Sequence, residues 1–233
     1  MTGLAALARL TWRRRLRGRA IWVSLLFMAA PTVMALVALD PYRPPSTVWN
    51  EALGTAIGLL AILPPLHLAG AIGDEVDSHT YTYLWSRPIP RWSVLAAKLL
   101  ALVPLVALSI VISIVPAWPI SGIDAGLFFR CAGALVLGAI TTSAASAAIG
   151  TIVPRYPLPA AIAFLLLFDI TLGAIPFAGR NLSVSYHVRN LSGVFGEAAS
   201  SAPEALLWCG AIAAVWMATA IQRVTRAEYA RAD

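Results

Sequence analysis

Long apolar runs alternate with short polar segments along the whole chain. Six of these runs are long enough to cross a bilayer, because a hydrocarbon core of about 30 Å requires about 20 apolar residues in a helix. They cover residues 20–39, 52–72, 94–118, 127–153, 158–177 and 205–221. The pattern therefore predicts an all-α, polytopic membrane protein with six transmembrane helices, which together make one domain of residues 1–233.

Composition agrees with a membrane protein. Hydrophobic residues make up 59% of the chain and charged residues only 12%, whereas about a quarter of the residues of a soluble domain are charged. The net charge of +6 does not point to nucleic acid, since phosphate binding would need a soluble basic face. Cys131 and Cys209 lie in apolar runs without metal-ligand spacing, so we expect packing residues and no metal site.

Basic residues indicate the orientation of the spans. With the N-terminus inside, Arg43, Arg130, Arg180 and Arg189 are the basic residues on the outer side, and the other 13 of the 17 lie inside. The positive-inside rule then places both termini in the cytoplasm, in a cytoplasmic (inner) membrane. Residues 4–19 alternate Leu, Trp and Arg, which fits either an N-terminal amphipathic helix on the lipid surface or a basic flank that only sets topology.

The segment 178–204, between the last two runs, is too long for a bare connection. It mixes Val, Tyr, Leu and Phe with Gly, Ser and Asn, and so predicts short helices or a re-entrant hairpin on the outer face. An outer-face protein partner could bind there.

Small residues recur every four positions in the fourth run, at Gly138, Thr142, Ser146 and Gly150. This spacing puts them on one helix face and predicts close helix packing. Prolines within or near the other runs indicate kinked spans, which suit a pore or gate but also occur in plain bundles.

One polar stretch interrupts the middle of the chain: GDEVDSHTYTYLWSRPIPRWSVLAAK, residues 73–98. As a helix, 74–86 would place Asp77, Tyr81, Leu84 and Trp85 on one face. Its first turn would carry acids, and two prolines would end it at Pro88 and Pro90. The stretch therefore predicts a short cytoplasmic helix with an aromatic side for the membrane and a polar side for a soluble partner.

This stretch resembles the first cytoplasmic loop of type-two ABC exporter permeases. Members of that family typically carry a Glu, a Gly-Thr, two apolar residues, Ser-x-Pro, a basic residue and a Gly-Lys at the next span. Here His79 and Ala97 stand where the family often has Gly. Six spans, inward termini and a long outer segment before the last span are similar too.

The resemblance implies that the loop is a coupling helix that docks on a cytoplasmic ABC ATPase subunit. Its coupling region comprises Asp74, Glu75, Asp77, His79, Thr80, Tyr81, Ser86, Arg87, Pro88, Arg91 and Lys98. The chain contains no G-x-x-x-x-G-K-[ST] motif, so we expect ATP and Mg to bind the partner and this chain not to be an enzyme by itself.

Six spans form half of a permease, so a second copy or a related permease would complete the exporter. The alternative is a membrane subunit that does not transport, but transmits force to, or anchors, an outer partner.

Two ionisable residues fall inside predicted spans. Asp169 lies near the middle of the fifth span and reads either as a pathway or proton-binding residue or as a hydrogen-bonded packing residue. His67 follows a double proline in the second span, where a structural histidine is favoured over a proton relay. Arg130, near the outer end of the fourth span, is expected to extend toward the headgroups. An intramembrane hydrolase built on Asp169, His67 and a hydroxyl ranks well behind, because no G-x-S-x-G turn is present.

Overall fold

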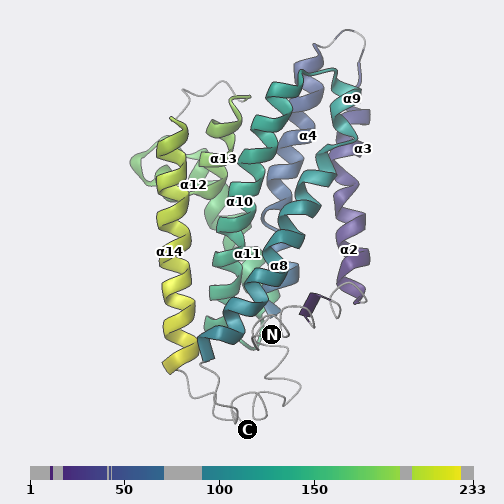
Figure 1. The fold of residues 1–233 in the computed structure, drawn as a ribbon. Coiled ribbons are helices and arrows are strands. Elements are labelled where there is room, and N and C mark those ends of the chain that lie inside the picture. The colour runs from purple at the N-terminus through teal and green to yellow at the C-terminus, as the bar shows by residue number, and fades with distance from the viewer. Residues whose placement is uncertain are drawn as a thin grey trace.

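The computed structural model describes residues 11–12, 18–40, 42, 44–70, 91–194 and 201–226, and this part of the chain is helical without strands. The helices run in an up-and-down bundle (Figure 1). In chain order they are α2 (Arg19–Met28), α3 (Ala30–Val37), α4 (Pro45–Leu59), α5 (Leu63–Leu68), α8 (Arg91–Ile114), α9 (Ala117–Ser121), α10 (Ala125–Ile152), α11 (Pro157–Phe164), η1 (Leu165–Ile170), α12 (Thr171–Ala174), η2 (Ala178–Leu182), α13 (Val184–Ser192) and α14 (Ala202–Arg226).

Six helical spans are long and apolar enough to cross a membrane, so the predicted all-α, polytopic membrane protein is confirmed. They are Ala20–Val37, Pro45–Leu68, Trp92–Ser121, Ala125–Ile152, Pro157–Ala174 and Ala202–Arg226. We call the end of the bundle that carries the start of α2 and the end of α14 the proximal end, and the end that carries α9 the distal end (Figure 1).

The second span starts earlier than its apolar run predicted, at Pro45 instead of residue 52. Proline is well suited to the first turn of a helix, where its missing N–H is not needed. Polar Ser46 and Glu51 are exposed there, while Val48 and Trp49 are buried. Mean hydropathy over a window averages the polar and the apolar face, so the amphipathic first turns of this helix do not stand out as an apolar run.

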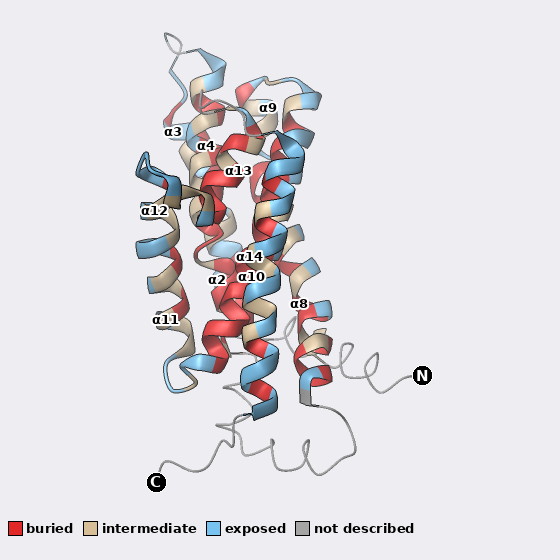
Figure 2. Ribbon diagram, turned by 90° about the vertical axis from the view of Figure 1, so that its left-hand side faces the viewer, coloured by how far each residue is buried: buried red, intermediate tan, exposed pale blue. Residues whose placement is uncertain are grey.

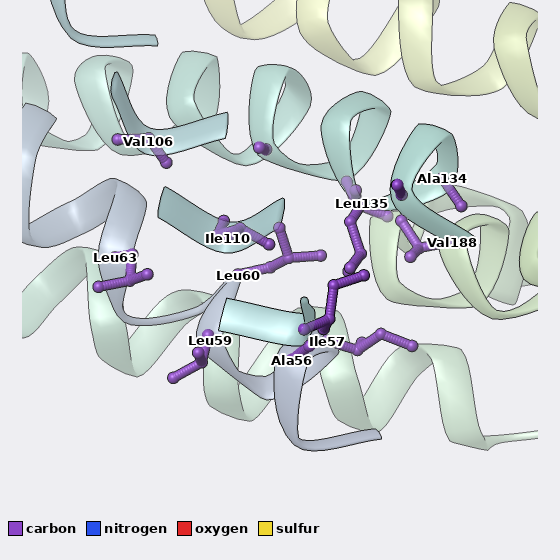
Figure 3. Packing of buried hydrophobic residues seen from close by; sticks show 14 of the residues in the cluster. Ala56, Ile57, Leu59, Leu60, Leu63, Val106, Ile110, Ala134, Leu135 and Val188 are labelled. Atoms are coloured by element: carbon purple, nitrogen blue, oxygen red, sulfur yellow. The ribbon is translucent and has the colours of Figure 1, made fainter. Parts of the chain in front are cut away.

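The fourth span, α10, is the centre of the molecule. Its span is 78% buried, against 17% for the first and last spans, and Figure 2 shows this contrast as a red α10 beside a largely pale blue α14. α10 packs against α5, α8, α11, α13 and α14. Apolar side chains from α4, α8, α10 and α13 gather into one cluster (Figure 3).

Four spans are interrupted. The first consists of α2 and α3, the second of α4 and α5, the third of α8 and α9, and the fifth of α11, the π-helix η1 and α12. Two predicted elements, the N-terminal amphipathic helix over 4–19 and the coupling helix over 74–86, fall almost wholly or wholly outside the described residues.

Candidate functional site

The segment between the fifth and sixth spans forms the short helices η2 and α13, as predicted for 178–204. α13 does not lie on the surface: seven of its nine residues are buried, and it packs against α10, α14 and η1. Val188 of α13 faces Gly138 of α10, and the Ser192 carbonyl faces the Cys131 thiol. α13 therefore runs antiparallel to α10, with its N-terminus deeper in the bundle than its C-terminus.

Asp169 binds the deep N-terminus of α13. Its two carboxylate oxygens accept from the backbone N–H groups of Val184, at 2.6 Å, and Ser185, at 3.0 Å. Asp169 lies 12 residues after Pro157, about 18 Å along the fifth span at 1.5 Å per residue. An acid at a helix N-terminus is favourable because the N-terminal N–H groups carry partial positive charge. Asp169 is thus hydrogen-bonded to α13, and its role as a pathway or proton-binding residue stays a prediction.

Ser183 completes the N-terminus of α13. Its hydroxyl oxygen accepts from Tyr186 N–H at 3.2 Å, and its own N–H donates to the Arg180 carbonyl at 2.9 Å. Together with the two bonds to Asp169, these satisfy all four N–H groups that a helix leaves unpaired at its beginning. Unpaired backbone groups cost several kcal/mol in hydrocarbon, so this accounting allows α13 to begin inside the membrane.

The C-terminus of α13 is satisfied in the same way. Arg130 of α10 donates through Nε to the Leu191 carbonyl at 2.7 Å, and Gly193 N–H donates to the Asn190 carbonyl at 3.1 Å. The other two of the four terminal carbonyls accept from a hydroxyl and a thiol. Ser192 Oγ donates to the Arg189 carbonyl at 2.6 Å, and Cys131 Sγ lies 3.9 Å from the Ser192 carbonyl oxygen. Arg130 therefore serves a helix end, with the charge sign that a C-terminus favours.

The π-helix η1 is the element that carries Asp169. The Asp169 carbonyl accepts from the hydroxyls of Ser183, at 2.8 Å, and Ser185, at 3.2 Å. Gly173, one turn further on, lets the two segments approach, since a Cβ there would lie 2.6 Å from the Ser183 hydroxyl oxygen. π-Helical turns within spans often mark functional positions. Here the π-turn carries both the carboxylate and the carbonyl that hold α13.

Buried polar side chains continue along α13. His187 donates from Nε2–H to the Asn181 carbonyl at 2.8 Å. Its ring stacks on that of Trp208 in α14, with the two ring centroids 6.3 Å apart. His187 Nδ1 and both amide atoms of Asn190 are buried without a hydrogen-bond partner in the described part of the chain. Arg180 covers the ring of Tyr186 at 4.7 Å.

His67 lies in α5 and is almost fully buried. Its Nε2 is 2.8 Å from the hydroxyl oxygen of Ser24 in α2. Ser24 Oγ also donates to the Ala20 carbonyl at 2.8 Å. A carbonyl can only accept, so the single hydroxyl proton goes to Ala20 and His67 Nε2–H must be the donor to Ser24. His67 and Asp169 thus serve different helices.

The small-residue face of α10 packs closely, as its spacing predicted. A Cβ at Gly138 would lie 2.7 Å from Val188 Cγ2 and 2.8 Å from Leu60 Cδ1, and one at Gly150 would overlap the Ala69 carbonyl oxygen. Thr142 and Ser146 on this face donate to carbonyls of their own helix.

Most of the predicted coupling region is outside the described residues, namely Asp74, Glu75, Asp77, His79, Thr80, Tyr81, Ser86, Arg87 and Pro88. Arg91 begins α8 at the proximal end, and Lys98 is half-buried seven residues further along the same helix. These two positions stay consistent with a site at the proximal end.

Charge is distributed unequally between the ends of the bundle. Four acids of the described part lie in the distal half, Asp40, Glu51, Asp124 and Glu204, and Asp169 lies near the middle of the bundle. The basic residues of the described part divide six to three in favour of the proximal half, with Arg19, Arg91, Lys98, Arg155, Arg223 and Arg226 there and Arg130, Arg180 and Arg189 distal.

Sequence reasoning did not find how α13 is held. Ser183 and Gly193 are ordinary start and stop signals that delimit its nine residues. The bonds from Asp169 and Arg130 join residues 15 and 61 positions apart, and no local pattern encodes them. Comparison with protein-family models and with curated proteins gives no match for this chain.

Proposed function

We propose that the chain is the transmembrane permease subunit of an ATP-driven ABC exporter. The observation that carries the proposal is the polar stretch 73–98 between the second and third spans, with its resemblance to a coupling loop. Six spans and the long segment before the last one, which carries the buried helix α13, support it. A cytoplasmic ABC ATPase would bind ATP and Mg, and a second permease copy or a related chain would complete the pathway.

The charge difference between the two ends supports the orientation. Basic residues favour the cytoplasmic side of a span, and the proximal end, at which both the polar stretch and the termini are anchored, is the basic one. The proposed location is therefore a cytoplasmic (inner) membrane with both termini in the cytoplasm. A reporter enzyme fused after Arg226 that is active only outside the cytoplasm would overturn this orientation if it were active.

Co-purification tests the proposed ATPase partner. The tagged chain is purified from its native membrane in mild detergent, and the eluate is assayed for ATPase activity and identified by mass spectrometry. We expect an ABC ATPase at near-equal stoichiometry, lost in Glu75→Arg. Glu51→Arg is the matched control, because Glu51 is an exposed acid in the distal half. If the chain elutes alone under conditions that preserve known ABC complexes, the exporter proposal is wrong.

A membrane subunit that anchors or transmits force without transport is the second candidate. α13 favours it, since Asp169 and Arg130 hold this helix in place and are thereby engaged in structural bonds. Vesicles that contain the complete complex separate the two candidates: ATP-dependent movement of a labelled lipid or drug supports the exporter. An ATPase complex with an outer partner and no movement of any cargo supports the anchor.

A further inference from the structure

The second span is broken about two-thirds of the way from the distal end. Between α4 and α5, three successive N–H groups reach back only three residues: Leu60 to Ile57 at 3.1 Å, Ala61 to Gly58 at 3.0 Å and Ile62 to Leu59 at 3.0 Å. Pro64 and Pro65 follow and have no N–H, so the carbonyls of Leu60 and Ala61 lose the donors that a continuous helix would supply. Such a break is a place where a span can bend.

The first span is broken as well. Ala29 separates α2 from α3, its N–H reaches back three residues to Leu26 at 3.3 Å, and Pro31 lies in the first turn of α3. Two neighbouring spans therefore share the same design, with a short turn followed by proline.

The hydrogen bond between Ser24 and His67 shows that the two breaks lie level with each other. Ser24 is five residues to the proximal side of Ala29, and His67 is five residues to the proximal side of Ile62. Since these two side chains touch at 2.8 Å, each break is about 7.5 Å distal of the same bond. The breaks form one line across both spans.

The helices on the two sides of this line share α8 as a neighbour and differ in their other contacts. On the distal side α3 packs against α4, α8 and α9. On the proximal side α2 packs against α5 and α8, and α5 packs in addition against α8, α10 and α11. The Ser24–His67 bond joins the two proximal pieces to each other. Both of its side chains are almost fully buried, so the bond is not exchanged for water.

We propose that α2 and α5 form one rigid unit that tilts about the line of breaks relative to α3 and α4, with the Ser24–His67 bond holding its two helices together. The unit would give the proposed exporter a way to bend its first two spans, and only this use rests on the proposed function. The tilt itself is a property of the chain and is tested without an ATPase or a cargo.

Distances between spin labels test the tilt in the full chain reconstituted in lipid, with Cys131 and Cys209 replaced by Ala. The proximal pair is Trp22→Cys with Ile152→Cys, and the distal pair is Val33→Cys with Phe129→Cys; all four positions are exposed on the bundle. In the parent chain we expect a broader distance distribution for the proximal pair than for the distal pair.

Variants of the bond and the break give the decisive comparison. Ser24→Ala should raise the population of a second proximal distance about three- to five-fold, the effect of losing one buried hydrogen bond. His67→Gln keeps an N–H that can donate to Ser24 and should stay closer to the parent chain. Pro64→Ala with Pro65→Ala restores the missing N–H groups and should narrow the proximal distribution.

Two outcomes would overturn the proposal. One is a proximal distribution that is the same in all variants, which would mean that the breaks are rigid. The other is a distal pair that changes as much as the proximal pair, which would mean that the bundle as a whole has loosened. Either outcome leaves the ATPase partner of the proposed function untouched, because that partner is tested by co-purification.

Discussion

The ends of α13 and the break between α4 and α5 both lie inside the bundle, and they are built in opposite ways. At α13, every N–H at its beginning and every carbonyl at its end is paired. Asp169, Arg130 and Cys131 of other spans supply some of the partners, and residues within and beside α13 supply the rest. At the break between α4 and α5, Pro64 and Pro65 lack the N–H groups that would pair the carbonyls of Leu60 and Ala61. In the described part of the chain no other hydrogen bond to these two carbonyls replaces them. An interruption that is fully paired is fixed, whereas one that lacks donors is free to bend.

The difference follows from the solvent. Hydrocarbon offers no hydrogen bonds, so a backbone group that leaves a helix must find a partner within the protein. α13 obtains these partners from Asp169 and Arg130, which belong to two other spans. At the breaks in the first two spans, most backbone N–H groups stay paired because they bond to the carbonyl three residues back instead of four. These breaks therefore need few partners from other segments.

The largest effect is expected when the cap of α13 is removed. Asp169→Ala leaves two buried N–H groups unpaired, at about 1–3 kcal/mol each, so we expect the free energy of unfolding in detergent to fall by about 2–6 kcal/mol. Asp124→Ala removes a similar cap from α10, where Leu127 N–H donates to it at 2.9 Å, but at an exposed end. Water can replace that bond, so its loss should be about 1 kcal/mol. Equal losses would show that α13 is not fixed by Asp169.

Next in size is the close packing of α10. Gly150→Ala would overlap the Ala69 carbonyl oxygen, which belongs to backbone and cannot move aside easily. We expect a loss of about 1–3 kcal/mol in the free energy of unfolding. Gly133→Ala lies on the same helix with open space around its Cβ, and should be neutral or stabilising by up to about 1 kcal/mol. Similar losses for both would refute close contact at Gly150.

A smaller effect is expected at the other end of α13. Arg130→Met removes the bond to the Leu191 carbonyl and the favourable charge at a helix C-terminus, and should cost about 1 kcal/mol of stability. Arg130→Lys keeps the charge and should lose less. A Met variant as stable as the native chain would mean that Gly193 and the thiol of Cys131 suffice to end α13.

The smallest effect concerns access and not stability. Ala61→Cys at the break of the second span, with both native cysteines replaced by Ala, is compared with Cys131 as the single thiol; both positions are buried. A small membrane-permeant maleimide should react faster at position 61, because local opening is easier where backbone donors are missing. Faster reaction of Cys131 would reverse the comparison between the two regions.

The six spans could be read from the sequence because the length of an apolar run is a local property. The sites could not. Ser183 and Gly193 predict the ends of α13, but the residues around them do not predict that the helix is buried inside the bundle. In the same way Pro64 and Pro65 predict a kink, but not that it lies level with the break at Ala29.

The sequence by itself determined that the chain crosses a membrane six times and that its basic residues gather toward one end. Only the tertiary structure decided what the polar side chains inside the spans do. Asp169 and Val184 are 15 residues apart, Ser24 and His67 are 43 apart, and Arg130 and Leu191 are 61 apart. A buried polar group binds whatever the fold brings within about 3 Å, and hydrophobic periodicity places helix faces without specifying such pairs.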